Sequence, residues 1–84
     1  MELRGNLLTR VSLADEADFF LAETKDIGRG GVCVVSDRAI PTNSVLRCEM
    51  VAPGSSIGVP TLMLVRWTEG VGNRRFRIGL QFLL

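Results

Sequence analysis

The chain alternates apolar and polar residues with a period of two, and this pattern constrains its fold more than any other feature. Six segments carry such an alternation or a β-branched apolar run: residues 6–14, 19–24, 31–36, 44–52, 60–68 and 75–84. A period of two places successive side chains on opposite faces of a strand, whereas an amphipathic helix has a period near 3.6. We therefore expect an all-β protein with no substantial helix. Residues 12–21 are rich enough in Ala, Asp and Glu to make a short helix the alternative there.

Turn residues separate the six segments. Residues 15–18 form a polar corner, glycines mark residues 28–31, and Pro, Gly, Asn and Ser mark 41–44, 53–56 and 70–73. A chain of 84 residues has room for one core, so residues 1–84 are expected to form a single domain. Because closure removes unpaired strand edges, we expect a small six-stranded antiparallel β-barrel. The apolar C-terminal end either packs against this barrel or continues in a longer natural chain from which the domain is excised.

Composition argues against most catalytic chemistry. Histidine is absent, which removes the usual general base and the usual imidazole metal ligand. Cys33 and Cys48 lie fifteen residues apart and cannot form a zinc site without other ligands. Each lies in an apolar strand-like run, which favours a reduced core thiol over a disulfide. We expect no enzymatic activity, no metal and no cofactor.

Charge and hydropathy also limit the partners. The formal net charge of +1 argues against DNA or a membrane surface as the main partner. The N-terminus lacks the apolar segment of a signal peptide, and no apolar run approaches the roughly 18 residues of a membrane span. We expect a cytoplasmic protein that does not insert into membranes.

The stretch Lys25–Val32 combines an aspartate with three glycines directly before a β-branched run. It resembles the DxSxxG motif of the PilZ family, the bacterial receptors for cyclic di-GMP. The closing segment Phe76–Phe82 is similar to the last strand of that family's barrel. The resemblance covers nearly the whole chain and implies a Greek-key, PilZ-like barrel. It also implies a nucleotide-binding role in bacterial second-messenger signalling.

The resemblance further implies a set of ligand-binding residues. Asp26 would accept hydrogen bonds from guanine, and Gly31 would be the turn glycine of the motif. The family also has an RxxxR motif, whose arginines grip phosphates and guanine edges. Its second arginine corresponds to Arg4, and its first would fall one residue before Met1. The implied binding residues are Arg4, Asp26, Gly28, Arg29, Gly30 and Gly31.

Two departures from the family pattern leave a second function open. Gly28 stands where the family has a serine, and the first arginine of RxxxR has no counterpart in residues 1–84. The alternative is a degenerate PilZ-like adaptor that acts through a protein partner or an attached effector domain. On this interpretation Asp26 caps the turn, and the glycines only supply positive φ angles.

The segment Arg74–Arg77 places three arginines near Trp67 in the expected barrel. These residues would bind phosphate or single-stranded nucleic acid, or they would form a charged edge that blocks strand pairing. Trp67 itself is expected to pack at the rim of the barrel or to stack on a base.

Overall fold

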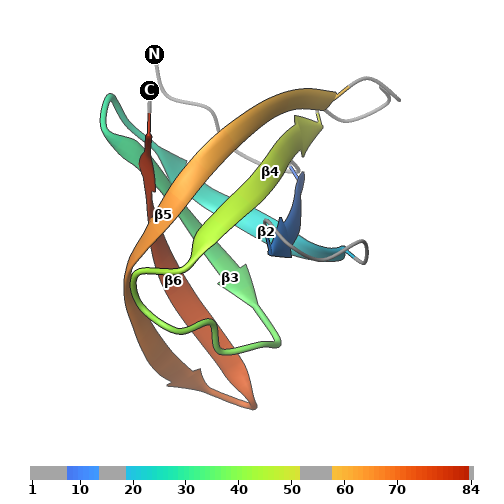
Figure 1. The fold of residues 1–84 in the computed structure, drawn as a ribbon. Coiled ribbons are helices and arrows are strands. Elements are labelled where there is room, and N and C mark those ends of the chain that lie inside the picture. The colour runs from blue at the N-terminus through green and yellow to red at the C-terminus, as the bar shows by residue number, and fades with distance from the viewer. Residues whose placement is uncertain (1–7, 14–18, 52–57, 84) are drawn as a thin grey trace.

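The computed structural model describes residues 8–13, 19–51 and 58–83, and these form antiparallel strands (Figure 1). The strands are β1 (Leu8–Leu13), β2 (Phe20–Ile27), β3 (Gly31–Ser36), β4 (Val45–Val51), β5 (Gly58–Gly72) and β6 (Arg75–Phe82). The described residues contain no helix. The prediction of an all-β antiparallel fold is confirmed for this part of the chain. Of the alternative helix, residues 12–13 and 20–21 are strand, and residues 14–18 lie outside the described residues.

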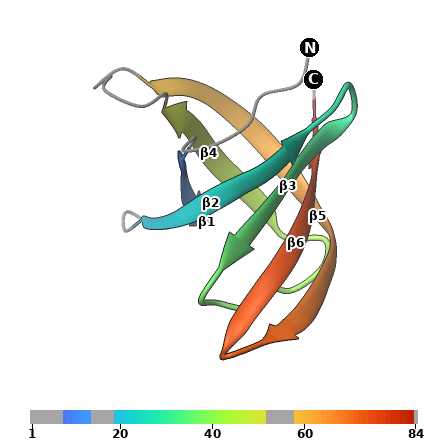
Figure 2. The same cartoon turned by 180° about the vertical axis from the view of Figure 1, so that it is seen from behind.

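The strand order around the sheet is β1-β2-β3-β6-β5-β4, and β1 pairs with β4 as well as with β2. The run β4-β1-β2-β3 is the spatial order of a Greek key. Figures 1 and 2 show the strands curled around a common interior, with the β2–β3 and β5–β6 hairpins at opposite ends. Because β6 pairs with both β3 and β5, the interpretation of Arg74–Arg77 as a charged sheet edge is wrong.

Alternate apolar side chains of the strands point inward and form the core. Val32 and Val34 of β3 are buried in this way, as are Ile78 and Leu80 of β6. The buried cluster as a whole comprises Val11, Ala22, Val32, Val34, Ile40, Leu46, Cys48, Met63, Val65, Ile78 and Leu80. Its members come from all six strands and from the β3–β4 loop, which gives the sheet one continuous interior.

The two cysteines differ in position, although both are free thiols. Cys48 lies in the core as predicted, and burial raises the pKa of its thiol to about 12. Cys33 is half-buried on the outer face of β3, between the inward-pointing Val32 and Val34. The prediction of a core position is therefore wrong for Cys33.

The β3–β4 loop covers the end of the barrel near the β5–β6 hairpin. Ile40 of this loop is buried in the core, and its carbonyl oxygen accepts a hydrogen bond from Thr68 Oγ1 at 2.8 Å. The Ser36 hydroxyl accepts a hydrogen bond from the Arg38 backbone N–H at 3.0 Å. This end of the interior is thus filled by the protein itself.

Two strands extend further than the alternation predicts. β2 continues to Ile27 rather than ending near residue 24, and β5 continues to Gly72. The predicted turn at residues 70–73 is therefore displaced to Asn73-Arg74. In both strands a register shift, between Thr24 and Asp26 or between Gly70 and Gly72, interrupts the period-two pattern. The extra residue of such a bulge changes the phase of the alternation, so the rest of the strand no longer fits the pattern from which strands were predicted.

Candidate functional site

A row of four residues crosses the outer face of the sheet from β2 to β5. Asp26 pairs with Cys33, Cys33 pairs with Gly79, and Gly79 pairs with Trp67. Residues that pair across neighbouring strands project from the same face. The row therefore brings an aspartate and a tryptophan, 41 positions apart in the sequence, to the two ends of one surface.

Both ends of this row face outward because of a bulge. The buried Thr24 precedes Asp26 by two positions, so simple alternation would turn Asp26 inward as well. The register shift between these residues inserts Lys25, and Asp26 is exposed. In β5 the shift between the buried Val65 and Trp67 inserts one residue in the same way, and Trp67 is 42% exposed. Two bulges thus re-aim the two side chains best suited to contact a ligand.

The indole ring of Trp67 lies directly against the backbone of Gly79. A Cβ atom built on Gly79 would overlap the indole ring, with the nitrogen and its neighbouring ring carbons as the nearest atoms. The missing side chain of Gly79 is thus the space that Trp67 occupies. An aromatic ring over a cross-strand glycine stabilises a sheet by burying the exposed backbone. The indole is thus held against the sheet at Gly79, and the exposed part of Trp67 is accessible from solvent.

The glycine-rich hairpin forms the other wall of the site. The Gly28 N–H donates a hydrogen bond to the Gly31 carbonyl oxygen at 2.9 Å, and the Gly30 carbonyl oxygen accepts one from the Phe82 N–H at 2.9 Å. Among the described glycines only Gly72 has a positive φ. The interpretation that Gly28, Gly30 and Gly31 supply positive φ is therefore wrong.

Gly31 is required for space instead. A Cβ atom at Gly31 would overlap the carbonyl oxygen of Leu80, whereas a Cβ at Gly28 or Gly30 would meet nothing within 4 Å. Gly31 thus lets β3 and β6 approach each other closely, and the other two glycines leave open space beside the hairpin. Asp26 itself is a paired residue of β2, so its backbone belongs to the strand that leads into this hairpin.

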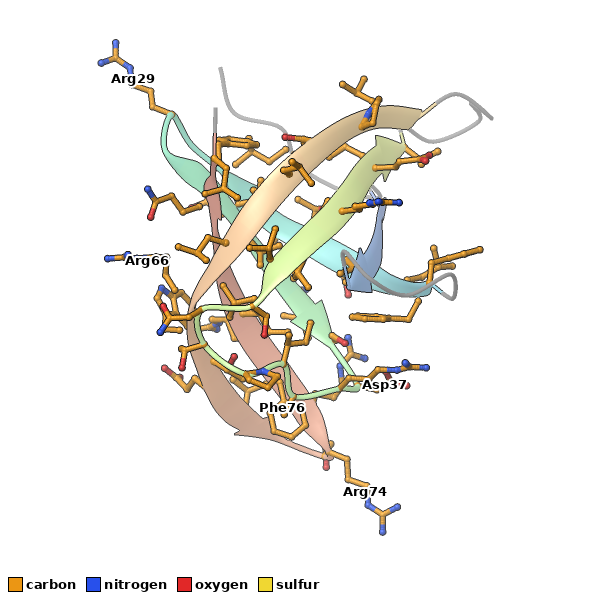
Figure 3. All side chains as sticks on the ribbon, in the orientation of Figure 1. Arg29, Asp37, Arg66, Arg74 and Phe76 are labelled. Atoms are coloured by element: carbon orange, nitrogen blue, oxygen red, sulfur yellow. The ribbon has the colours of Figure 1, made fainter. Side chains whose placement is uncertain are left out.

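The β2–β3 hairpin and strands β5 and β6 line an open groove with a volume of about 480 Å³. Of the predicted binding residues, Asp26, Gly28, Gly30 and Gly31 line this groove. Arg29 does not line it and points away from the barrel at the tip of the hairpin (Figure 3). Arg4 lies outside the described residues.

Three lining residues with polar or thiol side chains were not predicted as part of the site: Arg66, Gln81 and Cys33. Arg66 is the extra residue of the β5 bulge, is exposed, and projects from the same side of the barrel as Arg29 (Figure 3). No sequence signal marks it, because a polar residue beside a strand tryptophan resembles an ordinary surface position. Trp67 was considered as a base-stacking residue, and its place in the groove fits that interpretation.

The floor of the groove is weakly polar. Partial burial is the main cause that raises the pKa of the Cys33 thiol, while the Arg77 guanidinium lowers it and Asp26 and Glu69 raise it further. The neutral thiol lies between a carboxylate at one end and Arg66 at the other. No group of three or more potential metal ligands occurs in the described part of the chain. The groove therefore offers hydrogen-bonding groups, an exposed indole and one guanidinium.

The described strands thus form an antiparallel sheet that curls around one interior and carries an open, partly polar groove on its outer face. The PilZ domain family model matches residues 2–84, essentially the whole chain. The chain belongs to the PilZ domain family. Neither a curated protein nor a solved structure matches it significantly. The described residues contain no helix of the length and apolarity needed to cross a membrane.

Proposed function

We propose that this protein is a cytoplasmic signalling module that binds cyclic di-GMP in the groove between Asp26 and Trp67. The observation that carries the proposal is the row from Asp26 to Trp67, which sets a carboxylate and an indole at the two ends of one groove. Its volume of about 480 Å³ is within the usual range of small-molecule sites. In this proposal the ring of strands is the closed six-stranded barrel of the family.

Each part of the groove has a role in the proposed complex. The Asp26 carboxylate accepts hydrogen bonds from the N1 and N2 donors of a guanine base, and the open face of Trp67 stacks on a base. The guanidinium of Arg66 approaches a phosphate or a guanine edge from the rim. Arg4 and Arg29 are proposed to contact the phosphates, as the family resemblance implies.

The test is a calorimetric titration of the protein with cyclic di-GMP at moderate salt. We expect the wild-type protein to bind, and Asp26→Asn to weaken the affinity tenfold or more. The asparagine amide nitrogen would face the N–H donors of guanine, from which the aspartate carboxylate accepts hydrogen bonds. Asp37→Asn is the matched control, since Asp37 is an exposed aspartate in the β3–β4 loop, away from the groove (Figure 3). Absence of heat and of any thermal shift at several hundred micromolar ligand would contradict direct binding.

One observation favours the adaptor as a second candidate. Gly28 supplies no hydroxyl where the family has a serine, which removes a hydrogen bond that contributes about 0.5–1.5 kcal/mol in a typical case. A folded protein that fails to bind cyclic di-GMP would support the adaptor, which would act through a protein surface. The same titration therefore separates the two functions.

A further inference from the structure

We propose that a second groove on the same outer face binds an extended acidic segment of a partner protein. This groove, here called the basic groove, lies between β2 and the β5–β6 hairpin and has a volume of about 330 Å³. Its charged lining residues are Glu23, Lys25, Arg75 and Arg77, and its apolar ones are Val35 and Val71. The proposal does not depend on nucleotide binding, because none of these residues lines the groove at Asp26.

The basic groove concentrates positive charge on a nearly neutral protein. Three cations and one carboxylate line it, which gives a local formal charge of +2, while the whole chain has a formal net charge of +1. The remainder of the chain is therefore slightly negative. A local excess of this kind attracts an acidic partner and repels a basic one.

Two cations of the basic groove already bind a carboxylate of the protein itself, that of Glu23. Lys25 Nζ lies 3.0 Å from Glu23 Oε1, and Arg75 lies 3.6 Å from Glu23 Oε2. The hydrogen bond from Lys25, with smaller help from Arg75, holds the pKa of Glu23 below its usual range. Arg77 takes part in neither ion pair. Its planar guanidinium is thus available, among the described residues, to a carboxylate from outside.

The cross-strand register places Arg77 beside the apolar part of the groove. Glu23, Val35, Arg77 and Glu69 form a row across β2, β3, β6 and β5, next to the row that contains Asp26. Val35 is 8% exposed and forms the floor, while Val71 is 43% exposed and forms a wall. Val71 is the extra residue of the second bulge in β5. An apolar side chain between two acidic ones fits this arrangement of valines and cations.

An extended peptide suits this groove better than a free anion. The side chains of Glu23, Lys25 and Arg75 are about half exposed, and a single exposed ion pair contributes little binding energy. Useful affinity therefore requires a ligand that contacts several cations and the valines at once. Addition of the partner as a further strand is excluded here, because all four strands under the groove pair on both sides.

The test uses the whole protein and a fluorescent peptide with Glu-Val-Glu between Gly-Ser flanks, followed by polarisation at low salt. Matched peptides replace Glu-Val-Glu by Gln-Val-Gln or by Glu-Ser-Glu. We expect wild type to prefer Glu-Val-Glu over both, and Arg77→Gln to weaken binding about three- to fivefold. Val71→Ser should remove the preference for Glu-Val-Glu over Glu-Ser-Glu.

Arg47→Gln is the control variant, because Arg47 is an exposed arginine on β4 that does not line the groove. Asp26→Asn should bind the peptide at least as tightly as wild type does, because Asp26 does not line the basic groove and the substitution removes a nearby negative charge. This expectation keeps the test separate from that of nucleotide binding. The proposal is overturned if wild type ignores the peptide up to millimolar concentration. It is also overturned if Arg77→Gln binds like wild type, or if Arg47→Gln loses as much affinity as Arg77→Gln at an unchanged melting temperature.

Discussion

The β2–β3 and β5–β6 hairpins, at opposite ends of the sheet, reverse the chain direction with different residues. The β2–β3 hairpin is built from Gly28 to Gly31, yet none of its three glycines has a positive φ. The β5–β6 hairpin turns through Asn73 and Arg74, with φ angles of 52° and 58°. Positive φ at both central residues is the requirement of a type I′ turn, which matches the twist of the strands. Thus none of the glycines in the β2–β3 hairpin has a positive φ, whereas in the β5–β6 hairpin an arginine has one.

The contrast separates two reasons for a glycine. At the β5–β6 turn the backbone conformation makes a side chain unfavourable, whereas at Gly31 a neighbouring strand occupies the space. Glycines of the second kind shape the groove at Asp26, because they let β3, β6 and Trp67 lie close together. If this distinction is correct, substitutions in the two hairpins will differ in sign as well as in size.

The largest effect is expected for Gly31→Ala. The new Cβ would overlap the Leu80 carbonyl oxygen, and a backbone atom cannot move aside without disturbing the β3–β6 ladder. We expect a loss of about 3 kcal/mol in the free energy of unfolding, measured by urea denaturation. Gly30→Ala is the control, since its Cβ would meet nothing within 4 Å and should change stability by less than about 0.5 kcal/mol. Equal effects at the two positions would contradict the distinction.

Gly79→Ala is expected to have the next largest effect. Its methyl group would displace the indole of Trp67, the only tryptophan of the chain. We expect a loss of about 2 kcal/mol in stability and a red shift of tryptophan fluorescence as the ring moves into solvent. Gly70→Ala provides the comparison, because its Cβ would lie 3.9 Å from the Phe76 ring, an ordinary contact. An unchanged emission spectrum in Gly79→Ala would mean that Trp67 does not rest on this glycine.

The inward face of the barrel was predictable from the sequence, and the outward face was only partly so. Residues such as Val32, Val34, Ile78 and Leu80 alternate regularly, and their strands overlap the predicted segments. Most inward positions must exclude water and therefore carry apolar residues, which makes the pattern visible in the sequence; the buried Thr24 is an exception. Bulges leave no comparable signal, because one extra residue shifts the phase without changing composition.

The candidate site shows the same limit. Asp26 and the glycines were found through a local motif, which lies within eight consecutive residues. Arg66, Gln81 and Cys33 come from strands that meet only after folding, and their residue types are ordinary for an outer sheet face. The position of Trp67 over Gly79 depends on the register between β5 and β6, which is shifted by the bulge at Arg66. Register is a tertiary property and cannot be derived from either strand alone.

A smaller effect is expected for Gly28→Ser, and it concerns binding rather than stability. Gly28 has open space and no positive φ, so a side chain fits without strain. If cyclic di-GMP binds in the proposed way, the added hydroxyl should tighten the affinity about two- to tenfold. Gly28→Ala is the control and should leave the affinity unchanged. Tighter binding by both variants would point to a stiffer hairpin instead of a new hydrogen bond.

The smallest effect is expected for Arg74→Gly, and its sign should be opposite to that of the first two. Arg74 holds a left-handed backbone conformation that is unfavourable for a residue with a Cβ, and its side chain extends into solvent (Figure 3). Replacement by glycine yields Asn-Gly, the preferred type I′ pair, and should raise stability by about 0.5–1 kcal/mol. Arg29→Gly tests the comparison directly, because Arg29 occupies the tip of the other hairpin without a positive φ. There glycine only increases the freedom of the unfolded chain, so stability should fall by a few tenths of a kcal/mol. The measurement is the urea midpoint of both variants at an unchanged m-value. A higher midpoint for Arg74→Gly and for Arg29→Gly alike would show that backbone conformation does not distinguish the two turns.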